Sequence, residues 1–439
     1  MLPPGSLDDG PPLSAPLRFF VTAACFGIGA GVLLAWTGPA LFQSRWTPQA
    51  LAFTHFITVG FMMQVILGAL QQLLPVLAGA PLAHPLRVAS IVHTAITVGA
   101  ILLISAFLSN YAPLFGLAVV WMACGVLTFV AVAIQALRRV SERGPVVRAL
   151  MFGMVGLAIT VSIGLTNALA RGWPIAISHG QWANVHLGWG FVAWGCAVLA
   201  AMNAVAMPMF QHAPAYPLWF VRIFAGTAVS VVAAWTLSEL VGLAAVSSVL
   251  AVGVVMVAAT FAILTLHLQL RTQRTALDAV QRLWRLGMIC ALVACGLWVA
   301  SRWTPALTQW DTWPLLFGAL LLVGGFMSVI LGMLYKIVPF LVWMHMQALG
   351  QRRLPTPPMK SVVPEFHVLG QSRAHMVSVV LVLAAAIWPD WLAHAAGLAL
   401  AFSSGWLLRN LLAAIQVYRA HQARLAALPV SPSQQAAAN

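Results

Sequence analysis

Twelve long apolar runs divide this chain, and they constrain its fold more than any motif does. Each run has roughly the length of a membrane-crossing helix, which needs about 20 apolar residues. Hydrophobic residues make up 62% of the chain and charged residues 7%, with a mean hydropathy of +0.94, whereas soluble proteins average about a quarter charged residues. A soluble enzyme, a disordered chain and a disulfide-stapled secreted domain are therefore excluded. The runs begin near Arg18, Gln49, Leu86, Pro113, Val146, Gly180, Pro217, Val246, Leu283, Trp313, Ala374 and Trp391.

This pattern predicts an all-α polytopic membrane protein with about twelve transmembrane helices in one domain, residues 18–420, surrounded by the lipid bilayer. Residues 1–17 contain five prolines and two aspartates, and residues 421–439 are mostly Ala, Pro, Ser and Gln. We expect both segments to be disordered tails. All five cysteines fall within apolar runs, so we expect them to be core residues rather than disulfides or ligands.

The basic residues predict the orientation in the membrane. With the amino terminus inside, only Arg45, Arg171 and Arg302 fall on the outer side, and the other 19 of the 22 Lys and Arg residues fall on the inner side. An excess of basic residues marks the cytoplasmic side. We therefore expect both termini in the cytoplasm and a location in a bacterial inner membrane. The net charge of +14 reflects this asymmetry and does not indicate a nucleic-acid partner.

A repeated motif stands before three of the runs. Ser44-Arg45-Trp46-Thr47-Pro48 precedes the second run, and the same five residues, Ser301-Arg302-Trp303-Thr304-Pro305, precede the tenth. A degenerate copy, Arg171-Gly172-Trp173-Pro174, precedes the sixth. Ordinary interfacial anchoring by Trp and Arg explains these residue types. It does not explain a shared pentapeptide.

The runs that follow this motif also end alike. The second contains Val65-Ile66-Leu67-Gly68 with Pro75 seven residues after the glycine, and the tenth contains Val329-Ile330-Leu331-Gly332 with Pro339 at the same spacing. In the sixth run, Ala201 and Pro208 stand in the same relation. We predict three repeated four-helix units, at about residues 18–137, 146–270 and 284–419, all with the same orientation because four is an even number.

Twelve helices in three four-helix arcs resemble subunit I of the heme-copper oxidases and nitric oxide reductases. In that family the second helix carries a histidine that ligates a low-spin heme near the outer face, and the sixth carries a copper-ligating histidine. Here the second run contains His55 and the sixth contains His186. The resemblance implies heme b as the cofactor, with copper possible, and other respiratory-chain membrane proteins as partners.

The depth of the two histidines agrees with this resemblance. His55 precedes Pro75 by 20 residues and His186 precedes Pro208 by 22, so each lies about 30 Å from the inner-face proline in a helix. Imidazole suits heme iron and copper, and polar groups inside a membrane are often functional. The alternative is that each is a hydrogen-bonded interfacial histidine. We expect His179, seven residues before His186, to lie in the outer loop.

The chain also departs from that family. The family's seventh helix supplies two copper ligands and its tenth supplies one histidine to each of two hemes. The seventh run here has no histidine, and the tenth has none before His345. A three-histidine copper centre cannot be assembled from these positions, so we do not expect complete oxygen or nitric oxide reduction.

The three outer arginines are the second group of candidate residues. Because the family's heme propionates project to the outer face, the resemblance implies that Arg45, Arg171 and Arg302 bind these carboxylates, which a guanidinium does bidentately. The alternative is lipid-headgroup anchoring. Glu239 is an acidic residue near the same side.

We therefore expect a heme-binding membrane protein with a redox, gas-response or cofactor-handling role, with His55 and His186 as ligands. A cofactor-free permease for a small substrate is one alternative, although transporter sites usually lie at helix breaks near the midplane and the prolines here lie at the inner ends. An assembly or structural partner of respiratory enzymes is another.

Overall fold

The computed structural model describes residues 11–272, 278–310, 312–349 and 354–428 of the 439. Within this part of the chain, twelve helices are long and apolar enough to cross a membrane, and no strand is present. The prediction of an all-α, twelve-span protein is therefore confirmed. Most of the two predicted tails, residues 1–10 and 429–439, lies outside the described residues.

Nine spans are single α-helices. They are α1 (Ser14–Thr37), α4 (Pro85–Ser109), α5 (Ala112–Arg139), α6 (Pro145–Gly172), α9 (Leu218–Val241), α10 (Ala244–Leu270), α11 (Ala279–Ala300), α15 (Glu365–Ala385) and α16 (Pro389–Ala426). α1 begins at Ser14, ahead of the predicted domain start at 18, and α16 ends at Ala426, beyond the predicted domain end at 420. The first span continues from α1 directly into a short 3₁₀-helix, η1 (Gly38–Gln43), and a second short 3₁₀-helix, η5 (Met359–Ser361), precedes α15.

The other three spans, the central spans, each contain two α-helices joined by a π-helix. They are α2 (Pro48–His55), η2 (Phe56–Met63) and α3 (Gln64–Ala78); α7 (His179–Gly188), η3 (Trp189–Cys196) and α8 (Ala197–Gln211); and α13 (Trp313–Ala319), η4 (Leu320–Met327) and α14 (Ser328–Ala348). Their apolar windows are 72, 78 and 72% buried, against 28 to 56% in the other nine spans. The central spans therefore form the inside of the bundle, and the other nine surround them.

Local sequence explains where several helices begin and end. Proline is tolerated in the first turn because its missing N–H would be unpaired there, and Pro48 begins α2 with the Thr47 hydroxyl accepting from the Ala50 N–H at 3.1 Å. At the other end, α3 stops at Gly79, whose φ of +60° favours glycine. Asp278 and Gln281 form a capping box at the start of α11. The two copies of the repeated pentapeptide lead into different structures. Pro48 begins a membrane span, whereas Pro305 begins a separate four-residue helix, α12 (Pro305–Thr308).

The π-helices begin at the same distance from the proline in each central span. Phe56, Trp189 and Leu320 each stand 19 residues before Pro75, Pro208 and Pro339 respectively. The fifth residue of each π-helix is small: Gly60, Ala193 and Gly324.

Each of these small residues lies against the span that precedes it in the chain. A Cβ on Gly60 would come within 2.4 Å of Phe26 in α1, and one on Gly324 would come within 2.7 Å of Cys290 in α11. In the third case the glycine belongs to the preceding span instead. A Cβ on Gly156 of α6 would come within 2.5 Å of the Ala193 carbonyl oxygen. Close packing of the preceding span therefore requires a small residue at this position.

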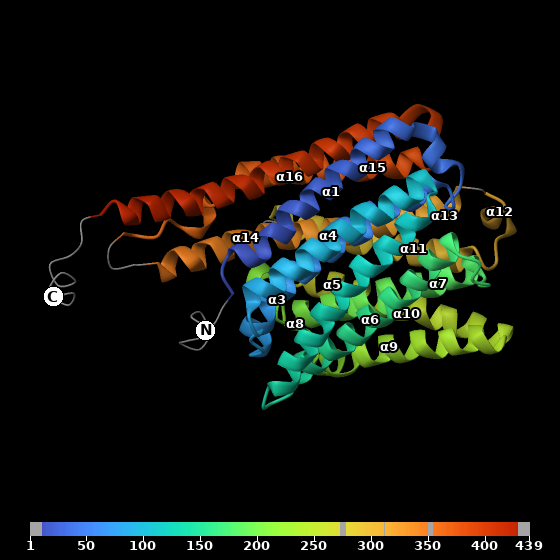
Figure 1. Ribbon diagram of the computed structural model, residues 1–439, viewed down its shortest axis with the longest axis horizontal. Helices are drawn as coiled ribbons and strands as arrows, with labels where there is room; N and C mark the ends of the chain where they lie inside the picture. Colours follow the sequence, from blue (N-terminus) through green and yellow to red (C-terminus); the bar gives the residue numbers. More distant parts are fainter. Residues whose placement is uncertain (1–10, 273–277, 311, 350–353, 429–439) are drawn as a thin grey trace.

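The first and last spans pack side by side along most of their length (Figure 1). Glycines on both helices allow the close approach: a Cβ on Gly31 would come within 2.3 Å of the Ala401 nitrogen, and one on Gly397 within 2.1 Å of the Ala35 nitrogen. In Figure 1 the carboxyl-terminal part of α16 extends beyond the bundle, at the end opposite to α7 and α12.

Candidate functional site

A cavity of about 880 Å³ extends between the central spans. All five residues that the sequence singled out line it: His55, His186, Arg45, Arg171 and Arg302. Ligand pockets in proteins typically enclose about 300–1,000 Å³, so this cavity has room for a large organic ligand. Most of its wall is apolar, with aromatic side chains from several spans.

His55 is the last residue of α2, where the π-helix begins. Its Nδ1 lies 2.7 Å from the Leu51 carbonyl oxygen, so Nδ1 carries the proton and donates it. The imidazole packs against the Phe107 ring of α4, with centroids 4.9 Å apart. His186 and Arg171 line the same cavity as His55, and the Phe107 ring also lies against Arg171. Two spans from different parts of the chain thus bring both imidazoles to one cavity.

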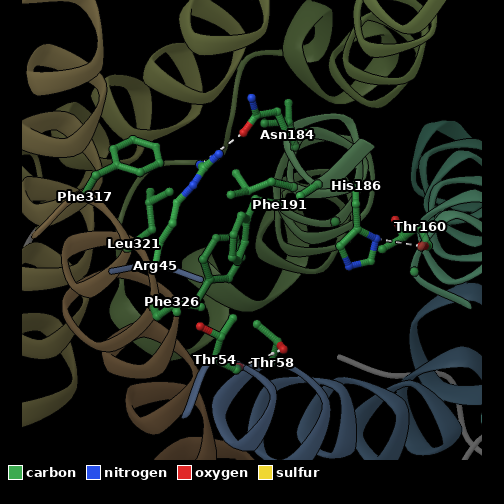
Figure 2. Close-up of a pocket in the computed structure, with 18 of the residues that line it drawn as sticks. Arg45, Thr54, Thr58, Thr160, Asn184, His186, Phe191, Phe317, Leu321 and Phe326 are labelled. Carbon is green, nitrogen blue, oxygen red and sulfur yellow. Dashed lines mark hydrogen bonds between the residues drawn. The ribbon is translucent and has the colours of Figure 1, made fainter. Parts of the chain in front are cut away.

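His186 is held in the same tautomer by a different helix. Its Nδ1 donates to the Thr160 carbonyl oxygen of α6 at 2.9 Å, as the dashed line in Figure 2 shows. The imidazole lies against Gly164, one turn further along α6, where a Cβ would come within 2.7 Å of the imidazole Cε1. Gly164 therefore provides the space that the imidazole occupies.

Both imidazoles are left with an unprotonated Nε2. No hydrogen bond to either Nε2 is found among the described residues. A metal-ligating histidine usually donates its other ring N–H to a carbonyl or carboxylate, which fixes the tautomer and the orientation. The same Nδ1 bond occurs at His345 and His394 outside the cavity, so it is the position in the cavity that distinguishes His55 and His186.

The three arginines share an arrangement, since each guanidinium lies over an aromatic ring. Arg45 lies 4.4 Å from the Trp46 ring centroid, Arg302 lies 4.3 Å from that of Trp298, and Arg171 lies 5.9 Å from that of Phe107. Such contacts hold a cation in place without neutralising it. The Phe107 ring thus has two partners in the cavity, the His55 imidazole and the Arg171 guanidinium.

Arg45 also connects two central spans. It stands between α1 and α2 and donates from a guanidinium nitrogen to the Asn184 side-chain oxygen of α7 at 3.2 Å (Figure 2). Burial lowers the pKa of the Arg45 guanidinium from its usual value, although arginine remains charged in proteins. A neutral partner leaves this charge available to an anionic ligand.

Glu239 is the single acidic residue among the described residues that line the cavity. Its carboxylate accepts from the Ser247 hydroxyl of α10 and from the Gln181 amide of α7, the latter at 2.8 Å. These neutral donors occupy the carboxylate, and it forms no ion pair with the arginines among the described residues. The cavity therefore carries more positive than negative charge.

Several residues of the site were not predictable from the sequence. Phe107, Thr160 and Gly164 stand at positions that no motif marks, and each contacts a histidine from another span. His179 was expected in a loop, and this was wrong: it is the first residue of α7 and lines the cavity. The helix begins one residue before the predicted start of the sixth run, near Gly180, so it includes His179.

In the described part of the chain, no group of three or more His, Cys, Asp and Glu side chains is placed to hold a metal ion. No protein-family model matches the chain, and no curated protein sequence matches it.

Proposed function

We propose that this chain is a membrane protein that binds heme b in its central cavity, with His55 and His186 as the ligands. The observation that carries the proposal is that both imidazoles line one cavity with Nδ1 bonded to a carbonyl and Nε2 free. Imidazole nitrogen is the usual protein ligand of heme iron. Copper is the second ligand that this pair of imidazoles suits.

The charge of the cavity supports the same ligand. Heme combines a large apolar ring with two carboxylates, and the cavity combines apolar walls with Arg45, Arg171 and Arg302. A guanidinium binds a carboxylate through two parallel hydrogen bonds. Asn184 and the aromatic rings would hold the guanidiniums in place before the ligand arrives. Lipid-headgroup anchoring remains the competing role for these arginines.

The scaffold in this proposal is a threefold repeat of four spans, as in subunit I of the heme-copper oxidases. Three features support it: the shared pentapeptide, the constant distance from π-helix to proline, and the small residue that meets the preceding span at Gly60, Ala193 and Gly324. In the orientation that the basic residues favour, the three arginines face the periplasm of a bacterial cell, and both termini face the cytoplasm.

A bound heme would supply redox or gas-binding chemistry, and the residues of the chain would bind and orient it. The Leu51 and Thr160 carbonyls set the tautomer of the two ligands, and the apolar wall excludes water. We infer a redox, gas-response or cofactor-handling role beside other respiratory-chain membrane proteins, rather than complete oxygen or nitric oxide reduction.

The test is an absorption spectrum of the full chain, purified in detergent and supplied with hemin, before and after reduction. We expect a Soret band in the wild-type protein, and its loss or a change of spin state in His55→Ala and His186→Ala. His93→Ala is the matched control, because His93 is a part-buried histidine bonded to Thr22 at 2.8 Å, outside the cavity. A wild-type protein that shows no Soret band after the unbound hemin has been removed would contradict the proposal.

A permease is the second candidate, and one observation favours it. The π-helices interrupt all three central spans near their middle, beside the cavity, and discontinuous helices at the midplane are typical of transporter sites. Uptake of a small anionic solute into liposomes by a heme-free preparation would support this function over the first.

A further inference from the structure

A row of buried polar side chains, the polar row, lies where α14, α15 and α16 pack together (Figure 1). Polar groups inside a membrane are costly and are often functional. Each side chain in the row belongs to a residue that is at most 7% exposed, and none of them lines the cavity. The row consists of Ser328 and Tyr335 of α14, Gln371 and His375 of α15, and Ser403, Ser404 and Asn410 of α16.

Hydrogen bonds join the three helices at three levels of this row. At the inner level, the Asn410 amide donates to the Tyr335 hydroxyl at 2.9 Å and to the His367 carbonyl oxygen at 3.5 Å. His367 is half-buried in the first turn of α15, so this level reaches the inner end of the helix. At the middle level, the Gln371 amide donates to the Ser403 carbonyl oxygen at 3.1 Å and to the Ser403 hydroxyl at 3.2 Å.

The deepest level lies beside the cavity. There, His375 Nε2 lies 2.9 Å from the Ser328 hydroxyl oxygen. The Ser328 hydroxyl donates to the Val323 carbonyl oxygen of η4 at 3.3 Å, so it accepts from the His375 Nε2–H, which leaves Nδ1 without a proton. Ser328 stands between Phe326 and Val329, which both line the cavity. The polar row therefore leads from the inner end of α15 to the wall of the cavity.

The three levels are spaced for water bridges. His367, Gln371 and His375 follow one another at intervals of four residues, so each level lies about 6 Å beyond the last along one face of α15. One water molecule with two hydrogen bonds of about 2.8 Å spans that distance. Gln371 Oε1, His375 Nδ1 and Ser404 Oγ are buried and have no hydrogen-bond partner among the described residues. Buried polar groups without a protein partner are usually bonded to ordered water.

We propose that the polar row is a proton path between the inner side of the membrane and the cavity, with His375 as its proton carrier. Imidazole suits this role because it accepts a proton at one ring nitrogen and releases one from the other. A proton reaches Nδ1 from the middle level through water, and the Nε2 proton leaves to the Ser328 hydroxyl, which passes its own proton toward the cavity. Each group gains and loses one proton, so the transfer balances without an oxidant or a reductant.

The path serves the heme proposed above, and this use of the path rests on that proposal. A one-electron donor that reduces ferric heme adds one negative charge to an apolar cavity, where an uncompensated charge is costly. One proton drawn from the inner side through the polar row restores the charge of the cavity. The path itself does not depend on heme, because its groups do not include His55 or His186.

The test that needs no heme is hydrogen exchange of the His375 imidazole. Solid-state NMR follows the ¹⁵N-histidine-labelled full chain in liposomes after transfer to D₂O, and the His375 signal is the one that His375→Gln removes. We expect wild-type exchange within seconds, and about 10-fold slower exchange in Gln371→Leu because a hydrogen-bonded link is lost. A wild-type signal that persists for hours, or equal exchange in Gln371→Leu and the wild type, would overturn the proposal.

Ser372→Ala is the matched control. Ser372 is 2% exposed on the same helix, but its hydroxyl donates to the Val368 carbonyl oxygen of that helix at 2.7 Å. This variant should therefore exchange at the wild-type rate.

A second measurement requires no variant. X-ray radiolysis of the wild type in H₂¹⁸O attaches ¹⁸O to side chains that contact bound water, and mass spectrometry locates the label. We expect label at His375 and none at Phe129, because both are 0% exposed but Phe129 belongs to the apolar core. An unlabelled His375 would show that the junction of the three helices is dry, and this would overturn the path.

Heme reduction distinguishes failure of the path from failure of the proposed function. When heme-loaded wild type in liposomes is reduced with dithionite, a pH dye on the side of the carboxyl terminus should report uptake of one proton per heme. Gln371→Leu should keep the Soret band and take up the proton more slowly. Reduction without proton uptake would overturn this use of the path. Absence of the Soret band would overturn the heme site, and the exchange measurement would then decide the path alone.

Discussion

At the scale of single residues, the cavity depends on side chains that hold other side chains. The two imidazoles are oriented by carbonyl oxygens, and the Phe107 ring contacts both His55 and Arg171. Loss of a group that holds a metal-ligating side chain in place typically lowers metal affinity about 10- to 100-fold. The residues around the histidines therefore offer sharper tests than removal of the histidines themselves.

Gly164→Ala tests the position of His186. The added methyl group would lie 2.7 Å from the imidazole Cε1, so the imidazole must move away from the Thr160 carbonyl. We expect heme affinity, measured by titration of the Soret band, to fall about 10- to 100-fold. Gly296→Ala is the control, because nothing lies within 4 Å of a Cβ at that glycine. Equal affinity in the two variants would show that His186 is not a ligand.

Arg45→Gln tests the role of the guanidiniums. Removing one charge-assisted hydrogen-bonding partner of a carboxylate should cost about 1.5–3 kcal/mol, which is about 10- to 100-fold in affinity for heme. Heme dimethyl ester, which lacks the carboxylates, should bind the variant and the wild type alike. Arg87→Gln is the control, since Arg87 is exposed at the start of α4, outside the cavity. If Arg45→Gln binds free heme unchanged, the lipid-anchoring role is favoured.

At the scale of helices, close packing depends on small residues at a few crossing points. Between α1 and α16, the Gly31 and Gly397 backbones contact the opposite helix directly. Small residues allow helices to approach within a membrane, where packing rather than the hydrophobic effect drives association. In the central spans, the small residue of each π-helix performs the same task against the preceding span.

Gly397→Ala tests the contact between the first and last spans. The added Cβ would meet the Ala35 backbone nitrogen at 2.1 Å, and the backbone cannot move aside as a flexible side chain can. We expect a loss of about 1–3 kcal/mol in stability, the usual cost of overpacking, measured by thermal unfolding in detergent. Gly405→Ala on the same helix meets nothing within 4 Å and should leave the unfolding temperature unchanged or raise it. Equal unfolding temperatures would contradict the close contact.

At the scale of the whole molecule, the bundle has one end that carries the three arginines and one that carries most other basic residues. This asymmetry predicts the direction of insertion. In a bacterial cell, Trp173→Cys should react with a membrane-impermeant maleimide in intact spheroplasts, because residue 173 is 45% exposed beyond α6. Glu142→Cys, at the other end of α6, should react only after the membrane is opened. The reverse pattern would place the arginines in the cytoplasm.

The number and order of the spans were predictable because hydropathy depends on local composition alone. The five candidate residues were also predictable, since charges and imidazoles are rare in apolar helices and therefore stand out. Their presence in one cavity was not, because it depends on how helices far apart in the chain pack together.

Tertiary structure alone decided the π-helices, the partner carbonyls and the glycine that makes room for His186. The role of a glycine or a leucine inside an apolar run cannot be read from the sequence, because it depends on the atoms of another helix that pack against that residue. The amino-acid sequence therefore determined that this chain crosses the membrane and which polar residues lie in or beside its spans. Packing of the helices determined which of those residues meet.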